Sequence, residues 1–363
     1  MRFIDEYRSE KLIRTLERKI SKEAVGEYTF MEVCGGHTAA IHRFGIPSLL
    51  PPSVRLLSGP GCPVCVTPVT FIDKAVALAS MERVTITSFG DLMRVPGTLS
   101  SLEKEKARGA DVRMVFSALD ALEMAKRDKK KRVVFMAIGF ETTAPGTAAA
   151  IIEAAKSKVD NFFVLNAHKV MPPAMEAIIR GGTTVNGFIC PGHVAAVTGA
   201  DVFSFIPRNY RIGCVISGFE PVDIMLSVYM LVKQVNNRQN KTEIQYSRVV
   251  TTEGNLKARK IMNDVFVPAD TEWRGIGIIK SGGLALADNY SAFDAERVFS
   301  ISAGVAGDRE NKLCLCGEVL RGRKSPPECR LFAKACTPVN PVGACMVSSE
   351  GACNAYYKYR RDE

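Results

Sequence analysis

The cysteines near the end of the chain are the residues best suited to chemistry. Six of the eleven cysteines fall within the last 50 residues, at Cys314, Cys316, Cys329, Cys336, Cys345 and Cys353. The stretch that carries them is rich in glycine, proline and polar residues, so it cannot build a large apolar core of its own. Bound metal or disulfides usually stabilise such segments. The six thiols therefore predict a metal cluster or a redox relay.

The start of the chain bears on the choice between metal and disulfides. Residues 1–8 contain neither the apolar run nor the small-residue cleavage site of a secretory signal peptide. The longest apolar runs, such as 133–138, are too short to span a bilayer. We therefore expect a cytoplasmic protein, and in that compartment clustered cysteines more often bind metal or act in redox chemistry than form structural disulfides.

The spacing of the six thiols favours an iron–sulfur cluster over zinc. Zinc ribbons usually hold their ion with two CxxC-like knuckles, and no CxxC occurs among these six cysteines. Long, irregular gaps suit a [4Fe–4S] cluster held by four thiolates from several directions. Zinc remains open as an alternative. Because six thiols exceed four ligand positions, two should be left over, and one member of the Cys314–Cys316 pair should be free of the cluster.

Three further cysteines follow predicted strands. Cys34 ends one strand and is followed by two glycines and His37. A thiol near a helix N-terminus should have a lowered pKa, which makes it a better thiolate. Cys62 and Cys65 form a CxxC after a Gly-Pro turn, a pattern typical of a dithiol–disulfide couple or of two ligands to one metal. The alternative for all three is a structural role as small buried side chains.

Polar side chains also gather where predicted strands give way to helices. Glu141, Thr142 and Thr143 follow the apolar strand 133–138, and His193 follows a later strand. In open α/β sheets, ligands bind where strands end and helices begin. We therefore expect these residues to face the same cleft as the thiols. The alternative is that the hydroxyls cap a helix and that the imidazole is structural.

The elements that would position these residues alternate between strand and helix. Strands are predicted at 28–33, 54–57, 84–88, 112–116, 133–138, 162–166, 185–189 and 214–217, with helices such as 69–80, 144–156 and 221–235 between them. This alternation predicts the α/β class with doubly wound parallel sheets. The length of 363 residues suggests several domains. We expect two α/β domains, at 1–131 and 132–245, and a small cysteine-rich iron–sulfur domain at 246–363.

Charge and missing motifs narrow the function further. The formal net charge of +10 is spread along the chain, and its densest run, 126–132, directly precedes an apolar strand. That run is expected to be a helix end and a turn, because no aromatic interleaving accompanies it as in a nucleic-acid patch. No Walker P-loop, GxGxxG or GxSxG motif occurs. We expect no nucleic-acid partner and no membrane partner.

Taken together, the motifs resemble those of the HypD family of [NiFe]-hydrogenase maturation proteins. The resemblance covers essentially the whole chain and rests on Cys34-Gly-Gly-His-Thr38, Gly59-Pro-Gly-Cys-Pro-Val-Cys65, Gly139-Phe-Glu-Thr-Thr-Ala-Pro145, Pro191-Gly-His193 and the C-terminal cysteines through Ser348-Ser-Glu-Gly-Ala-Cys353. It implies two α/β domains and a C-terminal domain with a [4Fe–4S] cluster. It also implies a scaffold on which the Fe(CN)₂CO unit of the hydrogenase is built. Its partners would be HypC in a stable complex, HypE as a transient cyanide donor, and the hydrogenase large subunit through HypC.

The same resemblance implies roles for single residues. Cys34 would hold the iron together with a cysteine of HypC, and Cys62 and Cys65 would be a redox dithiol or alternate iron ligands. The cluster would take Cys314, Cys329, Cys336 and Cys353. Cys316 and Cys345 would then relay electrons toward the CxxC by thiol–disulfide exchange. Orienting ligands or donating protons would fall to His37, Glu141, Thr142, Thr143 and His193.

Two other functions remain open at this point. A stand-alone iron–sulfur thiol/disulfide oxidoreductase would share the CxxC and the cluster but would turn over without HypC or HypE. A zinc-stabilised binding module would use the basic surface and carry no iron. Whether the chain is an enzyme in the strict sense is left open by the sequence.

Overall fold

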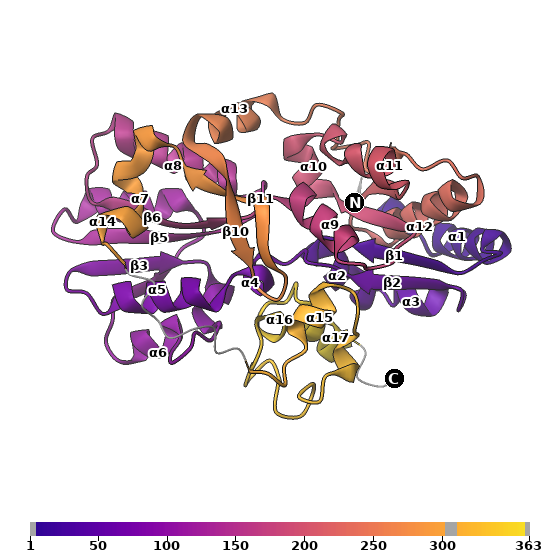
Figure 1. Ribbon diagram of the computed structural model, residues 1–363, viewed down its shortest axis with the longest axis horizontal. Helices are drawn as coiled ribbons and strands as arrows, with labels where there is room; N and C mark the ends of the chain where they lie inside the picture. The colour runs from indigo at the N-terminus through magenta and orange to yellow at the C-terminus, as the bar shows by residue number, and fades with distance from the viewer. Residues whose placement is uncertain (1–4, 302–310, 360–363) are drawn as a thin grey trace.

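The computed structural model describes residues 5–301 and 311–359. Within them the chain forms two parallel sheets, an antiparallel hairpin and a C-terminal segment of short helices and turns. In Figure 1 the two sheets lie side by side, the hairpin runs between them, and the yellow C-terminal segment lies below. No helix in these ranges is both long enough and apolar enough to cross a bilayer.

The larger sheet, sheet A, has five parallel strands and the smaller, sheet B, has four. Sheet A has the order β2 (Val54–Ser58), β1 (Tyr28–Glu32), β7 (Gly187–Pro191), β8 (Gly213–Ser217) and β9 (Thr242–Ile244). Sheet B has the order β4 (Val112–Met114), β3 (Val84–Ser88), β5 (Arg132–Gly139) and β6 (Phe162–His168). The predicted α/β class with parallel sheets is confirmed. All eight predicted strands form, and their ends differ from the prediction by at most two residues.

The chain builds sheet A in two separate stretches. It forms β1 and β2, leaves to build the whole of sheet B, and returns for β7, β8 and β9. The expected domain boundary at residue 131 therefore falls inside sheet B, between β4 and β5. The boundary at residue 245 falls just after β9, and the hairpin of β10 (Phe266–Trp273) and β11 (Gly277–Leu286) follows it.

Helices cover both sheets on both faces. The first half of the chain contributes η1 (Asp5–Arg8), α1 (Glu10–Glu23), α2 (Gly35–Arg43), α3 (Ile46–Leu49), α4 (Pro63–Val66), α5 (Val69–Ala79), η2 (Gly90–Arg94), α6 (Leu102–Ala107), α7 (Ala118–Arg127), α8 (Ala144–Lys156) and α9 (Met171–Arg180). The second half adds α10 (Gly192–Thr198), η3 (Asp201–Phe203), α11 (Phe205–Tyr210), α12 (Pro221–Asn236), α13 (Leu256–Val265), η4 (Asp288–Phe293), α14 (Ala295–Val298), α15 (Cys316–Leu320), η5 (Pro326–Glu328), α16 (Ala344–Val347) and α17 (Ala352–Tyr359).

The sequence pattern explains why these elements pack as they do. Residues 133–139 of β5 are all buried, as expected for a central strand covered on both faces. The helix α1 turns only Leu16 and Ile20 fully inward, because its apolar residues recur at helical spacing. The basic run 126–132 spans the end of α7, a turn and the first residue of β5. These elements place the carboxyl ends of both sheets next to the C-terminal segment.

Candidate thiol and metal centre

Cys34 lies at the carboxyl end of sheet A, between β1 and α2. It is the N-cap residue of α2 and has an extended backbone, with φ −148° and ψ 123°. The turn before the CxxC lies directly against it, because Gly35 N–H donates to Gly61 O at 2.9 Å. A Cβ atom on Gly61 would lie 2.2 Å from the Cys34 nitrogen, so only glycine fits there. The structure thus brings Cys34 and the CxxC together.

The environment of Cys34 corrects one expectation. Burial raises the pKa of the Cys34 thiol to about 12, and the carboxylates of Glu350 and Glu32 act in the same direction. The backbone N–H groups of Gly36 and His37 lower the pKa, but burial outweighs them. The prediction of a lowered pKa at a helix N-terminus is therefore wrong for the chain by itself. Glu350, within the C-terminal motif, touches Gly35 and was not singled out by the sequence.

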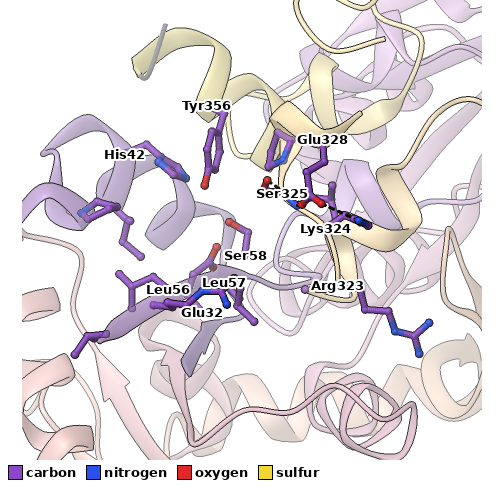
Figure 2. Close-up of a pocket in the computed structure, with 17 residues that line it drawn as sticks. Glu32, His42, Leu56, Leu57, Ser58, Arg323, Lys324, Ser325, Glu328 and Tyr356 are labelled. Atoms are coloured by element: carbon purple, nitrogen blue, oxygen red, sulfur yellow. Dashed lines mark hydrogen bonds and ion pairs between the residues drawn. The ribbon is translucent and has the colours of Figure 1, made fainter. Parts of the chain in front are cut away.

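Glu32 is a second residue that the sequence analysis missed. Its buried carboxyl group accepts hydrogen bonds from the Cys34 N–H at 3.0 Å and from the Thr38 hydroxyl. Burial raises its pKa to about 8. It also lines a cavity of about 290 Å³ between β2, α2 and the C-terminal segment, where His42, Ser58 and Tyr356 lie around it (Figure 2). A carboxylate inside an apolar strand was the signal that could have identified it.

Two predicted histidines meet on one aromatic ring. Phe219, which follows β8, stacks on His37 at 4.5 Å and on His193 at 4.1 Å between ring centroids. His37 is fully buried, its Nε2 lies 2.9 Å from Gly218 O, and burial lowers its pKa to about 4. His193 is exposed on the other side of the ring. Phe219 also packs closely on Gly36, where a Cβ would lie 3.1 Å from the ring.

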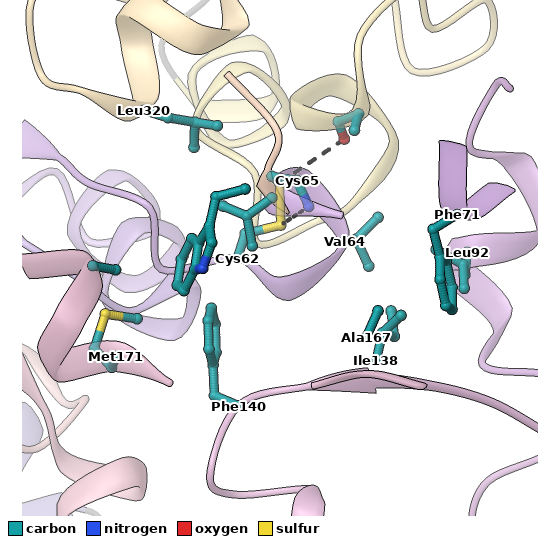
Figure 3. Close-up of a cluster of buried hydrophobic side chains, with 14 of the residues drawn as sticks. Cys62, Val64, Cys65, Phe71, Leu92, Ile138, Phe140, Ala167, Met171 and Leu320 are labelled. Atoms are coloured by element: carbon teal, nitrogen blue, oxygen red, sulfur yellow. Dashed lines mark hydrogen bonds between the residues drawn. A yellow bond between two sulfur atoms is a disulfide. The ribbon is translucent and has the colours of Figure 1, made fainter. Parts of the chain in front are cut away.

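The CxxC forms a disulfide in this structure. Cys62 caps the short helix α4, and its sulfur is bonded to that of Cys65. Both side chains are buried in the core that also contains Phe140, as Figure 3 shows. The Cys65 sulfur lies 3.9 Å from the carbonyl oxygen of Ala344, the residue before Cys345. The couple therefore lies between Cys34 on one side and the C-terminal thiols on the other.

The six C-terminal cysteines line one small cavity together with Phe332, Gly343 and Met346. Cys316 and Cys345 are both buried and are hydrogen-bonded to each other through their thiols. That hydrogen bond, burial and the nearby thiols raise the pKa of Cys345. The pKa of Cys314 is raised to about 12 by burial and by its neighbours Cys316, Cys329 and Cys336. The structure thus brings all six thiols to one place, whereas the metal cluster predicted from the sequence stays a prediction.

The donor set of this cavity suits an iron–sulfur cluster. Four thiolates are the usual ligands of [4Fe–4S], and six soft sulfur donors surround one space here. A Cβ on Gly343 would lie 2.7 Å from the Cys314 sulfur, so the backbone approaches the thiols closely. In the parts of the chain that the structure describes, no three His, Cys, Asp or Glu side chains are arranged to hold a single metal ion. Which four thiols bind a cluster remains a prediction.

Glu141, Thr142 and Thr143 lie apart from Cys34, at the carboxyl end of β5 in sheet B. The Glu141 carboxylate is buried and accepts the N–H of Met171, the first residue of α9, at 3.0 Å. The Thr143 hydroxyl donates to the carbonyl oxygens of Ile138 and Phe140, while Thr142 is exposed. These contacts stabilise the turn. A catalytic role for these three residues remains a prediction.

Comparison with known proteins agrees with this geometry. A family model named HypD and described as "Hydrogenase formation hypA family" matches residues 9–360. The chain is 45% identical over 372 residues to a hydrogenase maturation factor HypD of Rhizobium leguminosarum bv. viciae, covering 99% of this chain and 96% of that protein. It is 44% identical over 372 residues to the HypD of Escherichia coli K12, covering 100% and 99% of the two chains. A putative hydrogenase expression/formation protein of Methanocaldococcus jannaschii is 44% identical over 352 residues, covering 96% and 98%. The chain therefore belongs to the HypD family.

Proposed function

We propose that this protein acts in hydrogenase maturation, as a scaffold on which the Fe(CN)₂CO unit of a [NiFe]-hydrogenase is assembled. The names of its relatives support the role in maturation. One observation carries the finer proposal: Cys34, the Cys62–Cys65 couple and the Cys316–Cys345 pair follow one another along the carboxyl edge of sheet A and into the C-terminal segment. This order suits a thiolate that holds iron and a line of thiols that brings electrons to it.

In this proposal Cys34 binds the iron substrate together with a cysteine of HypC. A thiolate is a soft, strong ligand for iron, and iron binding would displace the proton that burial holds on Cys34. The glycines that follow Cys34 let Glu350 and the Phe219 ring of this chain pack close to the thiol. His37 and His193, which stack on either side of Phe219, would orient ligands or move protons.

The CxxC supplies the electrons that cyanide transfer needs. Cyanide would arrive as a thiocyanate on HypE, and breaking its sulfur–carbon bond is a two-electron reduction. The two thiols of reduced Cys62 and Cys65 give up two electrons and two protons and become a disulfide. The products are the free HypE thiol and hydrogen cyanide, whose carbon binds iron as cyanide after loss of the proton. Atoms and electrons balance without a further reductant.

The Cys316–Cys345 pair then restores the CxxC. The Cys345 thiolate attacks the Cys65 sulfur, the Cys62–Cys65 bond breaks, and Cys62 leaves as a thiolate that takes up a proton. Cys316 attacks Cys345, which releases Cys65 as the second thiol. The C-terminal pair ends as a disulfide, having passed on two electrons and two protons. The short distance from Cys65 to Ala344 supports this route.

A [4Fe–4S] cluster would be held by Cys314, Cys329, Cys336 and Cys353. When bound, it would supply electrons one at a time for reduction of the Cys316–Cys345 disulfide. The thiol–thiol hydrogen bond of Cys316 and Cys345 supports leaving these two outside the ligand set. The remaining partners in this proposal are HypC, HypE and, through HypC, the hydrogenase large subunit. The compartment proposed is the cytoplasm.

The first experiment is a Mössbauer spectrum of the ⁵⁷Fe-enriched protein, co-expressed with HypC and kept anaerobic. A cluster signal together with a separate low-spin ferrous site, and cyanide and carbonyl bands in the infrared, would support the scaffold. A cluster signal alone would contradict the iron-holding role of Cys34 in that complex. Absence of iron would contradict both parts and favour the zinc-stabilised alternative.

The buried disulfide also supports a second candidate function, a stand-alone thiol/disulfide oxidoreductase. Such an enzyme would reduce small disulfides over many turnovers without HypC or HypE. The scaffold predicts at most one or a few turnovers by the isolated chain. Counting disulfides reduced per protein molecule, with dithionite as electron source, separates the two functions.

A further inference from the structure

The hairpin of β10 and β11 connects sheet B with the thiol centre. In the middle of β11, Gly282 O accepts the Val170 N–H at 3.0 Å, which joins the hairpin to the carboxyl edge of sheet B. The buried Lys169 side chain adds two bonds, because its Nζ donates to Thr271 Oγ1 at 3.1 Å and to Glu272 O at 2.7 Å. In Figure 1 the hairpin points from this edge down to the yellow C-terminal segment.

The last residue of β10 stiffens the hairpin near its tip. Trp273 is fully buried, its Nε1–H donates to Gly282 O at 2.9 Å, and its ring stacks on Phe140 at 5.9 Å. Phe140 belongs to the same core as the CxxC. The tip is therefore fixed with respect to sheet B and to the buried disulfide.

The tip contacts the residue that follows one cysteine of each thiol pair. Arg274 N–H donates to the carbonyl oxygen of Val66, the residue after Cys65, at 2.9 Å. Gly275 lies against Gly317, the residue after Cys316, and a Cβ on Gly275 would lie 2.5 Å from the Gly317 Cα. The turn between the two strands thus lies between the CxxC helix α4 and the cysteine-bearing helix α15.

We infer that the hairpin tip sets the distance between the Cys62–Cys65 couple and the Cys316–Cys345 pair, and that Gly275 is the positioning residue of this contact. The inference rests on the electron relay of the proposed function. Thiol–disulfide exchange requires the attacking sulfur to approach the disulfide bond closely. A displacement of about 1 Å can slow such an oriented reaction about a hundredfold.

Two glycines in the same turn give a matched pair of variants. Gly275 and Gly277 both have a positive φ, +74° and +102°, so alanine strains the backbone at either position. Only at Gly275 does the added Cβ meet a neighbour, because nothing lies within 4 Å of a Cβ on Gly277. Gly275→Ala should push the two thiol pairs apart, and Gly277→Ala should not. Gly317→Ala tests the same contact from the opposite side, where a Cβ would lie 2.9 Å from the Gly275 Cα.

How readily the two thiol pairs approach each other can be measured as the rate at which a disulfide forms between Cys65 and Cys345. In a Cys62→Ser, Cys316→Ser background, Cys65 and Cys345 are the members of the two pairs that keep their thiols, and Cys65 Sγ lies 3.9 Å from the carbonyl oxygen of Ala344, next to Cys345. Diamide oxidises two thiols to a disulfide and is itself reduced to the hydrazide. The anaerobic, cluster-loaded protein is treated with diamide, free thiols are blocked with N-ethylmaleimide, and the Cys65–Cys345 disulfide is quantified over time by peptide mass spectrometry.

We expect Gly275→Ala and Gly317→Ala to slow cross-linking at least about tenfold relative to Gly277→Ala. All three variants should retain a cooperative thermal transition. If only one of Gly275→Ala and Gly317→Ala folds, that variant is compared with Gly277→Ala. Equal rates in Gly275→Ala and Gly277→Ala would overturn the role of the hairpin while leaving the relay intact. If no Cys65–Cys345 disulfide forms even with the natural hairpin, the relay of the proposed function is itself wrong. These two failures are therefore distinguishable.

Discussion

The buried carboxyl group of Glu141 should make the stability of the protein depend on pH, and Glu141→Gln should remove that dependence. Burial raises the pKa of Glu141 from its ordinary value of 4.5 to about 7. One carboxylate oxygen accepts the Met171 N–H, and the other is buried without a hydrogen-bond partner. A glutamine keeps the accepting oxygen and imitates the neutral, protonated acid.

The sign and size of the effect follow from the pKa of Glu141. Between about pH 4.5 and pH 7 the folded state keeps a proton that the unfolded state has already released, so the free energy of unfolding falls as pH rises. Above about pH 7 both states are ionised and the loss is complete. At about 1.4 kcal/mol per pKa unit, the wild type should lose about 2.5 kcal/mol more than Glu141→Gln between about pH 5 and pH 8.

Urea unfolding of both proteins across this pH range measures the difference directly. Burial lowers the pKa of His37 and His168 to about 4, and these groups change stability in the opposite direction below about pH 6.5. Their contribution cancels when the variant is subtracted from the wild type. Glu103→Gln, at an exposed position, is the matched control. The difference in free energy of unfolding between the wild type and this variant should not change over the same pH range. A wild-type–variant difference for Glu141→Gln that stays constant within about 0.5 kcal/mol from about pH 5 to pH 8 would refute the reasoning.

Three further predictions test other parts of the molecule. Cys329→Ala should abolish the visible absorbance of the proposed [4Fe–4S] cluster, whereas Cys190→Ala, which removes a buried thiol in sheet A, should leave it unchanged; a spectrum unaffected by the first change would remove Cys329 from the proposed ligand set. Arg248→Met should lower the free energy of unfolding by about 3 kcal/mol, measured in urea, because it leaves the fully buried carboxylate of Asp223 without its two-point ion pair. A loss below about 0.5 kcal/mol would contradict the reasoning that the buried Asp223 carboxylate depends on this ion pair. Cys34→Ala should keep the cluster absorbance but yield inactive hydrogenase in cells, and normal maturation would exclude Cys34 as the iron-holding residue.

The elements of the fold were readable from local pattern. Strands such as β5 are runs of branched apolar residues, and a run of that kind is buried wherever the chain places it. The pairing of those strands was not readable. That β1 lies beside β7, more than a hundred residues later, depends on which apolar faces complement each other in three dimensions. For that reason the boundary expected at residue 131 falls within sheet B.

For the candidate site, too, the sequence predicted some features, and others depend on tertiary packing. Sequence alone identified the cysteines and histidines, because their residue types carry the chemistry and cluster in short motifs. It could not identify Glu32 or Phe219, whose importance comes from what surrounds them after folding. It also gave the wrong direction for the pKa of Cys34, since a helix N-terminus is a local feature whereas burial and the approach of Glu350 are not.

The sequence by itself determined the kinds of atoms available to this protein, its alternation of strands and helices, and its membership of the HypD family. The tertiary structure alone decided which thiols meet. Up to about 300 residues separate Cys34, the CxxC and the C-terminal pair in the sequence. They come together because two sheet edges, a hairpin and a C-terminal segment with few apolar residues pack against one another. Long-range packing follows from the summed burial of many side chains, and no local motif encodes that sum.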